Sequence, residues 1–223
     1  MNPRFRLLVG PFLFSLFVFA ATIALGVWQV KRLHWKENLL AEIATAQANP
    51  PIPLAAVPRQ YTKVFVTGRW DHPDAVLYGT DVRGERLGSF LVEPLLRPGL
   101  PPLIVDRGFL PDDMQKPADP TGEVTVTGYI SDPDHPHWYS IKDDLAARHF
   151  YTLNPTAIAT ALGMAKPAPY LLELIGSQTS YPEPAHAFPD LPNNHLSYAI
   201  TWFSMALIDL VIFVLAARQT LRS

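Results

Sequence analysis

The sequence predicts a membrane protein in which two transmembrane α-helices flank one α+β domain, built mainly of antiparallel strands as a small barrel or sheet. An uncharged apolar run covers residues 7–28, and a second apolar run with one charged residue covers residues 196–217. Between them, short alternating segments are separated by prolines, glycines and aspartates, which is typical of strands and turns. This middle part, about 160 residues, is long enough to bury a core of its own.

The first apolar run, Leu7 to Trp28, is long enough to cross a bilayer. At about 1.5 Å per residue, roughly 20 helical residues span a hydrocarbon core of about 30 Å. The alternative is a cleaved signal peptide, whose apolar region of about 7–15 residues ends at a small-x-small site. Phe19-Ala20-Ala21 fits such a site poorly, and the apolar run continues past it. The pattern therefore favours a permanent anchor.

The second apolar run, Leu196 to Ala217, is interrupted only by Asp209 and is followed by Arg218 and Arg222. The cytoplasmic flanks of membrane spans are enriched in lysine and arginine, so the C-terminus is predicted to be cytoplasmic. Basic residues lie on both sides of the first run and do not orient it. These are Arg4 and Arg6 before the run and Lys31, Arg32 and Lys36 after it.

Two spans place both termini on the same side of the membrane. We expect a cytoplasmic N-tail (residues 1–6), a first span (7–28), a periplasmic domain (29–195), a second span (196–217) and a cytoplasmic C-tail (218–223). Six residues before the first span leave no room for a mitochondrial presequence. The expected location is therefore a bacterial inner membrane, with the multi-pass chain holding its central domain in the periplasm.

The domain is expected to contain short strands and one or two helices. Residues 31–47 should extend the first span as an amphipathic helix. A second helix is predicted to start at Asn154-Pro155 and to stop at Gly163, because asparagine caps a helix and proline suits its first position. Strands are predicted at residues 61–70, 75–78, 89–95, 102–107, 124–130 and 170–175.

Composition and motifs exclude several classes of function. The chain has no cysteine, which excludes a disulfide framework, a thiolate metal site and a thiol nucleophile. A net charge of −2 gives no basic surface for nucleic acid. Hydrolase elbow, phosphate-binding loop, dinucleotide fingerprint and HExxH motifs are missing from the sequence. His135-Pro136-His137, beside Asp132 and Asp134, suits either two ligands of a metal site or, by default, a plain solvated loop.

The start of the second span carries the most informative residues. His195, Tyr198 and Trp202 are spaced i, i+3, i+7 and so are expected on one helix face, with Asp209 near the same face. A charge in hydrocarbon is costly, so Asp209 should face protein or a cavity. A neutral imidazole near the membrane surface suits axial ligation of haem iron. The alternative is an ordinary interfacial belt, with His195 as a polar helix end.

The end of the first span carries a second basic and aromatic set. Trp28 and Arg32 are four residues apart, and Trp35 follows on the same face. Anchoring in lipid headgroups is the default function of such a set. Contact with haem propionates or with a partner protein is the alternative.

Four blocks of the sequence resemble the surfeit locus family of cytochrome c oxidase assembly factors. Residues 25–36 resemble the family signature LGxWQxxRxxWK. The other blocks are Val66–Asp71, residues 103–111 (family ilVnRGwvP) and residues 193–202 (family NxHLxYaxTW), and all four follow the family order. One departure is Asp106, where the family commonly has asparagine, and which is expected at a strand end.

The resemblance implies a role, without enzymatic activity, in maturing the haem-copper oxidase. It also implies binding of haem a, with His195 as the axial ligand of the iron and Tyr198 and Trp202 as pocket walls. The implied partners are the catalytic oxidase subunit and haem a synthase, together with the lipid bilayer. Fold roles are expected for three further matching residues, as glycines at turns or bulges and as an ion-pair partner: Gly68, Gly108 and Arg107.

Two functions remain open from the sequence. A haem chaperone would receive haem a through the His195–Tyr198–Trp202 face and pass it on, and a single exchangeable ligand suits that transfer. A scaffold would instead hold an oxidase subunit through Asp209, Trp202 and the soluble domain. A hydrolase held by two anchors ranks third, because no nucleophile–base pattern is found.

Overall fold

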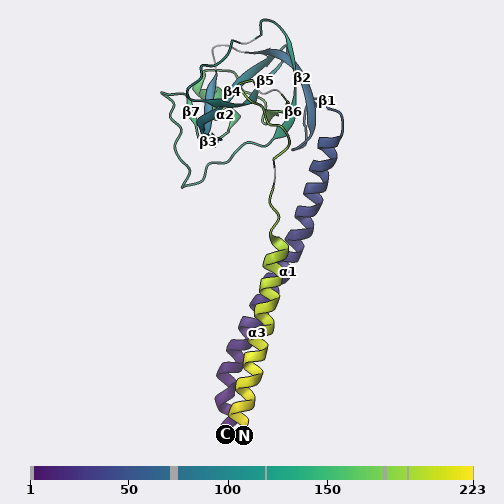
Figure 1. The fold of residues 1–223 in the computed structure, drawn as a ribbon, viewed down its shortest axis with the longest axis vertical. Coiled ribbons are helices and arrows are strands. Elements are labelled where there is room, and N and C mark those ends of the chain that lie inside the picture. The colour runs from purple at the N-terminus through teal and green to yellow at the C-terminus, as the bar shows by residue number, and fades with distance from the viewer. Residues whose placement is uncertain (1–2, 71–74, 119, 178–179, 190, 223) are drawn as a thin grey trace. The chain divides into compact units, whose positions relative to one another are not determined.

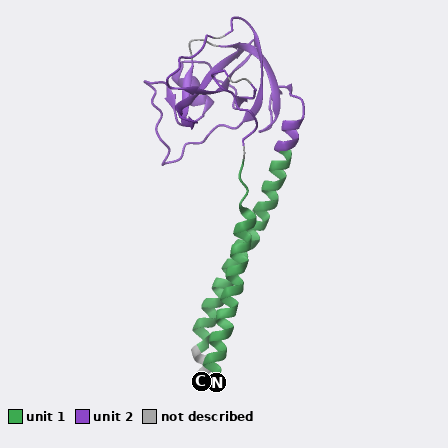
Figure 2. Cartoon of the chain, viewed as in Figure 1, with its two compact units in different colours: residues 1–42, 190–223 green, residues 43–189 purple. Residues whose placement is uncertain are grey.

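The computed structural model describes residues 3–70, 75–118, 120–177, 180–189 and 191–222, with the backbone alone for residues 3–7. It divides the chain into two compact units, coloured separately in Figure 2. Unit 1 comprises residues 1–42 and 190–223, and unit 2 comprises residues 43–189.

Unit 1 contains two long helices, α1 (Pro3–Ala48) and α3 (His195–Arg222), which Figure 1 labels. The last turns of α1, from Ile43, belong to unit 2. Both helices are long and apolar enough to cross a membrane. Their apolar side chains are exposed, with Phe14 at 70% and Phe17 at 71%. A core helix of a soluble protein buries such side chains, so these two need an apolar surrounding. Both predicted helices are confirmed, and α1 continues unbroken through the predicted extension at residues 31–47.

Among its described residues, unit 2 contains eight strands, whose pairing closes a barrel. Strand β2 pairs with β6, β6 with β8, β8 with β5, β5 with β4, and β4 returns to β2. The remaining three strands extend this ring, β1 from β2, β3 from β4 and β7 from β3. The bounds are β1 Ile52–Pro53, β2 Lys63–Trp70, β3 Val76–Arg83, β4 Arg86–Arg97, β5 Leu100–Pro111, β6 Val124–Ser131, β7 His149–Phe150 and β8 Leu171–Leu174.

Alternation in the strands supplies the core. In β2, buried residues alternate with exposed ones, so one face of the strand points inward. The barrel interior holds Val64, Val66, Trp70, Leu95, Leu103, Val105, Ile130, Ala168 and Leu172. A second core joins residues of β3, β4, β5, β7 and β8 to helix α2 (Pro155–Ala161), namely Val76, Val92, Ile104, Phe150, Leu153, Ile158 and Leu171.

Helix α2 begins where the sequence predicts. The Asn154 side chain accepts hydrogen bonds from the backbone N–H groups of Thr156 and Ala157, and Pro155 occupies the first turn. Leu162 caps the other end, and Gly163 follows with a φ of +68°, a left-handed conformation that suits glycine.

The strands differ from the prediction in two ways. Strands β1 and β7 were not predicted, and both pair in parallel, as do β5 and β8. Strand β5 also runs on to Pro111, so the expectation that Asp106 lies at a strand end is wrong. Asp106 is inside β5 and only 9% exposed. The sheet is otherwise antiparallel, as predicted.

Candidate functional site

The start of α3 meets α1 along one narrow stripe. Ala199 and Ala206 are 2% and 1% exposed, and His195, Trp202 and Asp209 are half-buried. These residues follow one another at alternating intervals of four and three, the spacing of a helix seam against one partner. The stripe therefore places His195 and Asp209 toward α1.

His195 meets a buried amide of α1. Its Nδ1 lies 2.7 Å from the side-chain oxygen of Gln29, which is 8% exposed. The neutral ring can donate one proton, and an amide oxygen can only accept one. The Nδ1–H group therefore donates to Gln29, which leaves Nε2 without a proton and with a lone pair for a ligand.

A glycine allows the two helices to approach beside this contact. A Cβ at Gly26 would lie 2.6–2.9 Å from ring atoms of Phe203, closer than side-chain carbons tolerate. Small residues at helix interfaces permit such close approach within membranes. Gly26 lies one turn before Gln29 on α1, so the packing of Phe203 helps to hold the Gln29 side chain within reach of α3.

Asp209 has its own partner on α1. The Ser15 hydroxyl donates to Asp209 Oδ2 over 2.9 Å. Ser15 and Gln29 are 14 residues apart, as are Asp209 and His195, so the two contacts share one antiparallel register about 21 Å apart along the helices. The expectation that Asp209 faces protein agrees with this contact.

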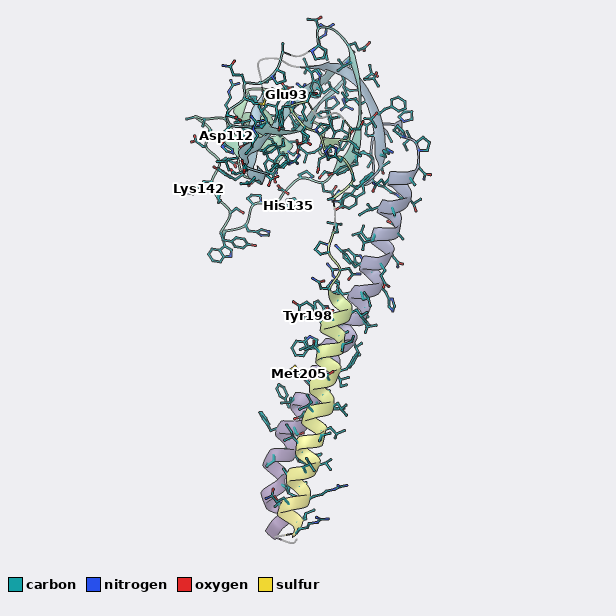
Figure 3. All side chains as sticks on the ribbon, viewed as in Figure 1. Glu93, Asp112, His135, Lys142, Tyr198 and Met205 are labelled. Carbon is teal, nitrogen blue, oxygen red and sulfur yellow. The ribbon has the colours of Figure 1, made fainter. Side chains whose placement is uncertain are left out.

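Tyr198 lies on the flank of the stripe and not within it. It is 56% exposed, and Figure 3 shows its side chain extending away from α3. The single face of His195, Tyr198 and Trp202 stays a prediction, and the three residues differ in how exposed they are. His195 and Trp202 point toward α1, whereas the exposed ring of Tyr198 is open to lipid, a ligand or a partner.

The basic and aromatic set of α1 lies on an exposed surface. Trp28 is 54% exposed and Trp35 is 48% exposed. The guanidinium of Arg32 lies 3.7 Å from the centre of the Trp35 ring, a cation–π contact. Arg32 thus pairs with Trp35, and Trp28 remains as an exposed ring one turn earlier.

In unit 2, Arg107 belongs to a buried charge cluster. Its guanidinium contacts the carboxylate of Glu93, which Figure 3 labels and which is 0% exposed. Lys116 contacts the same carboxylate, and the guanidinium also lies 4.6 Å from the centre of the Trp70 ring. These contacts give Arg107 a structural position in the barrel and do not place it at an open site.

The two glycines of the matching domain blocks lie where a side chain would collide with backbone. A Cβ at Gly68 would lie 2.6 Å from the carbonyl oxygen of Leu96, at the point where β2 leaves β6 for β4. Gly108 has a φ of +115° beside a bulge in β5, and a Cβ there would lie 2.0 Å from the carbonyl oxygen of Glu183. Gly68 thus permits barrel closure, and Gly108 permits the bulge.

Next to that bulge, two carboxyl groups face each other across β5 and β8. Asp106 and Glu173 are register partners, and burial first, then the Glu173 charge, raises the pKa of Asp106 to about 7. The Gly108 N–H donates to Asp106 over 2.8 Å and opposes this rise. The Tyr129 hydroxyl donates to Glu173, and burial raises the pKa of Tyr129 as well.

Replacement of this aspartate should stabilise the domain at neutral and higher pH. Because folding raises the pKa of Asp106 from 3.8 to about 7, the folded state holds the proton more tightly. The free energy of unfolding then falls as pH rises between these values. We expect Asp106→Asn to add about 1–3 kcal/mol at pH 8 and nothing at pH 3.5. Thermal unfolding of the full chain in detergent at both pH values measures this difference.

The matched control is Asp112→Asn, at an exposed position after the same strand. It should leave the melting temperature unchanged at both pH values. A gain for Asp106→Asn that is equal at pH 3.5 and pH 8 would contradict a titrating origin.

Two residues of the His135–His137 loop region have contacts of their own. Asp134 accepts hydrogen bonds from the Tyr78 hydroxyl and the Leu153 N–H, and so has a structural role. His137 stacks on Tyr139 with ring centres 5.2 Å apart. Within the described parts of the chain, no group of three His, Cys, Asp or Glu side chains is placed to hold a metal ion.

Sequence reasoning missed three residues that contact predicted site residues, namely Ser15, Gln29 and Glu93. A signal for each of them was present. Ser15, Thr22 and Gln29 are spaced by seven along and just after the first apolar run, and His195, Trp202 and Asp209 are spaced by seven at the start of the second. Matching heptads of polar residues on two spans indicate a shared interface. Glu93 stands alone in the apolar segment 91–95, which indicates a buried and paired charge.

Comparison with known proteins gives one consistent family. Residues 16–207 match the model of the SURF1 family. The chain is 27% identical over 212 residues to a SURF1-like protein of Rickettsia conorii, covering 90% of this chain and 88% of that protein. It is 28% identical over 229 residues to Surfeit locus protein 1 of Rattus norvegicus, covering 86% of this chain and 71% of that protein. It is 26% identical over 220 residues to the Homo sapiens protein of that name, covering 82% and 69%.

Proposed function

This chain belongs to the SURF1 family, and from that premise we propose that it is an assembly factor for haem-copper cytochrome c oxidase. In this proposal it binds haem a and helps to insert it into the catalytic subunit, without making or breaking a covalent bond. Haem a synthase is the proposed source of the haem, and the catalytic subunit is the proposed recipient.

One observation carries the proposal, the orientation of His195 at the start of an apolar helix. Its Nδ1 is engaged by Gln29, and its Nε2 has no hydrogen-bond partner among the residues the structure describes. Neutral imidazole with a free Nε2 is the common protein ligand of haem iron. A site that uses one side-chain ligand also suits release, because a chaperone must give up its cargo.

The residues around His195 fit a large, mostly apolar ligand. Tyr198 offers an exposed ring, and Trp202 offers a half-buried one. The side-chain oxygen of Asn193 is buried without a hydrogen-bond partner among the described residues, so it can accept from a bound group. Haem a, when bound, supplies the iron that an imidazole can hold.

Each residue then has a defined part in binding. His195 would hold the iron through Nε2, and Trp202 and Tyr198 would cover apolar macrocycle surface and exclude water. Aromatic side chains provide a large apolar contact area with a polar edge, which suits the membrane interface.

The proposed location is a bacterial inner membrane, with both termini cytoplasmic and the domain periplasmic. Arg218 and Arg222 at the end of α3 support this orientation through the positive-inside rule. The similar chain of Rickettsia conorii comes from a bacterium. In this arrangement His195 lies at the outer rim of the second span.

The scaffold alternative draws support from a different surface. Trp138 is 95% exposed, and Tyr139 and Ile141 are each 67% exposed. Exposed aromatic and aliphatic clusters mark protein interaction sites. Asp209, in contrast, is engaged by Ser15 and does not favour partner binding.

Purification from two hosts tests the proposal against the scaffold. We expect the tagged chain from a host that makes haem a to show the visible absorbance bands of haem a. The same chain from a host blocked in haem a synthesis should recover much less catalytic subunit, measured by immunoblot. A colourless protein from the first host, with equal subunit recovery from both, would contradict the chaperone and support the scaffold.

A further inference from the structure

The contact between Gln29 and His195 is more specific than helix packing requires. Gln29 is 8% exposed just after the apolar run of α1 ends, and a buried amide is costly unless it is hydrogen-bonded. The 2.7 Å separation between Gln29 Oε1 and His195 Nδ1 meets that need. An apolar residue at position 29 would avoid this cost, so the effect of the amide on the imidazole is the question that the contact raises.

Which ring nitrogen carries the proton decides whether the imidazole can bind a metal. Only a nitrogen without a proton offers a lone pair to iron, and the hydrogen bond at the other nitrogen selects it. In metal sites, the ligating histidine typically donates its second N–H to a carboxylate or carbonyl group, which also fixes the ring plane. The side-chain oxygen of Gln29 is a carbonyl acceptor at the required place.

We infer that Gln29 is a positioning residue for His195, one that accepts the Nδ1 proton and holds the ring with Nε2 open toward the haem iron. The inference rests on the proposed function, because it assigns a supporting role at the same ligand. It adds a residue from the first span to a site that sequence reasoning built from the second span alone.

A competing account gives Gln29 only a structural role in the helix pair. The Ser15–Asp209 contact lies two heptads away in the same register and provides the comparison. Buried polar contacts of this kind can fix helix register without touching a ligand. The experiment must therefore separate support of the imidazole from support of the helix pair.

Three variants of the full chain in detergent separate the two roles. Gln29→Met removes the acceptor at nearly equal side-chain length, Gln29→Glu keeps an acceptor and adds negative charge, and Ser15→Ala removes the other polar contact. Titration with haem a, followed by absorbance, measures affinity, and redox titration of the bound haem measures its midpoint potential. Haem b serves as a second probe.

We expect Gln29→Met to weaken haem binding about 10- to 100-fold. Gln29→Glu should bind haem nearly as well as the native chain, with the midpoint potential shifted to more negative values. A charged acceptor makes the imidazole a stronger donor, which favours ferric over ferrous iron. Ser15→Ala should leave both affinity and potential unchanged, because Ser15 does not touch His195.

Two results would overturn the inference and leave the proposed function intact. In the first, Gln29→Met binds haem like the native chain while His195→Ala does not. In the second, Gln29→Met and Ser15→Ala weaken binding equally and Gln29→Glu leaves the potential unchanged, which assigns Gln29 a register role. Retention of haem by His195→Ala would instead contradict the proposed ligand itself.

Discussion

His195→Ala is expected to remove most of the haem from the chain when it is purified from a host that makes haem a. The variant deletes the proposed axial ligand and leaves a space beside Gln29. We expect haem content per protein to fall more than about tenfold. Loss of a supporting residue typically costs 10- to 100-fold in affinity, and loss of the direct ligand should cost at least the lower of these values. The absorbance ratio of haem to protein in the purified sample measures this directly.

A matched control and a rescue exclude indirect causes. His34 is a histidine of α1 that is exposed and paired with Glu37 over 3.3 Å, and His34→Ala should retain the native haem content. Added imidazole should restore haem to His195→Ala by filling the vacated position, which an unfolded helix pair would not allow. Native haem content in His195→Ala would refute the ligand assignment.

Local sequence signals predicted the elements that depend on neighbouring residues. The two apolar runs predicted both long helices, since bilayer thickness sets their length. Asn154-Pro155 and Gly163 predicted both ends of α2, because capping is a local interaction.

Elements that depend on distant partners were missed for a physical reason. Strands β1 and β7 contain two residues each and exist only through parallel pairing with β2 and β3. Barrel closure rests on two register pairs, Arg69 with Leu96 and Trp70 with Leu95. Such pairing has no periodic signature within one segment, so a barrel and an open sheet could not be separated from the sequence.

In the candidate site, too, the sequence predicted individual residues but not their distant partners. The sequence predicted His195 and Asp209 from their chemistry within an apolar helix. It did not predict their partners, because Gln29 and Ser15 lie on the other span and become neighbours only through the helix register. Tyr198 shows the converse limit. The i, i+3 spacing places it near His195, yet a single partner helix covers only a narrow stripe and leaves Tyr198 exposed.

The buried charge cluster of unit 2 leads to the largest expected loss of stability. Glu93 is fully buried, and Arg107 and Lys116 compensate its charge. We expect Arg107→Met to lower the free energy of unfolding by about 3 kcal/mol, the lower end of the range for breaking a buried ion pair, because Lys116 remains. Denaturant unfolding of the full chain in detergent, followed by tryptophan fluorescence, measures the loss and includes Trp70, on which Arg107 lies.

A double variant separates the charge from the packing of the arginine. When Glu93→Gln is added to Arg107→Met, the buried charge without its main partner disappears, so at least about half of the lost stability should return. The control is Arg86→Met, which breaks an exposed ion pair with Asp113 and should change stability little. If Arg107→Met costs no more than this control, Glu93 does not depend on Arg107 for its burial. If the double variant recovers none of the lost stability, the loss arises from packing against Trp70. Arg107 would then stabilise the barrel through the contacts of its side chain and not through its charge.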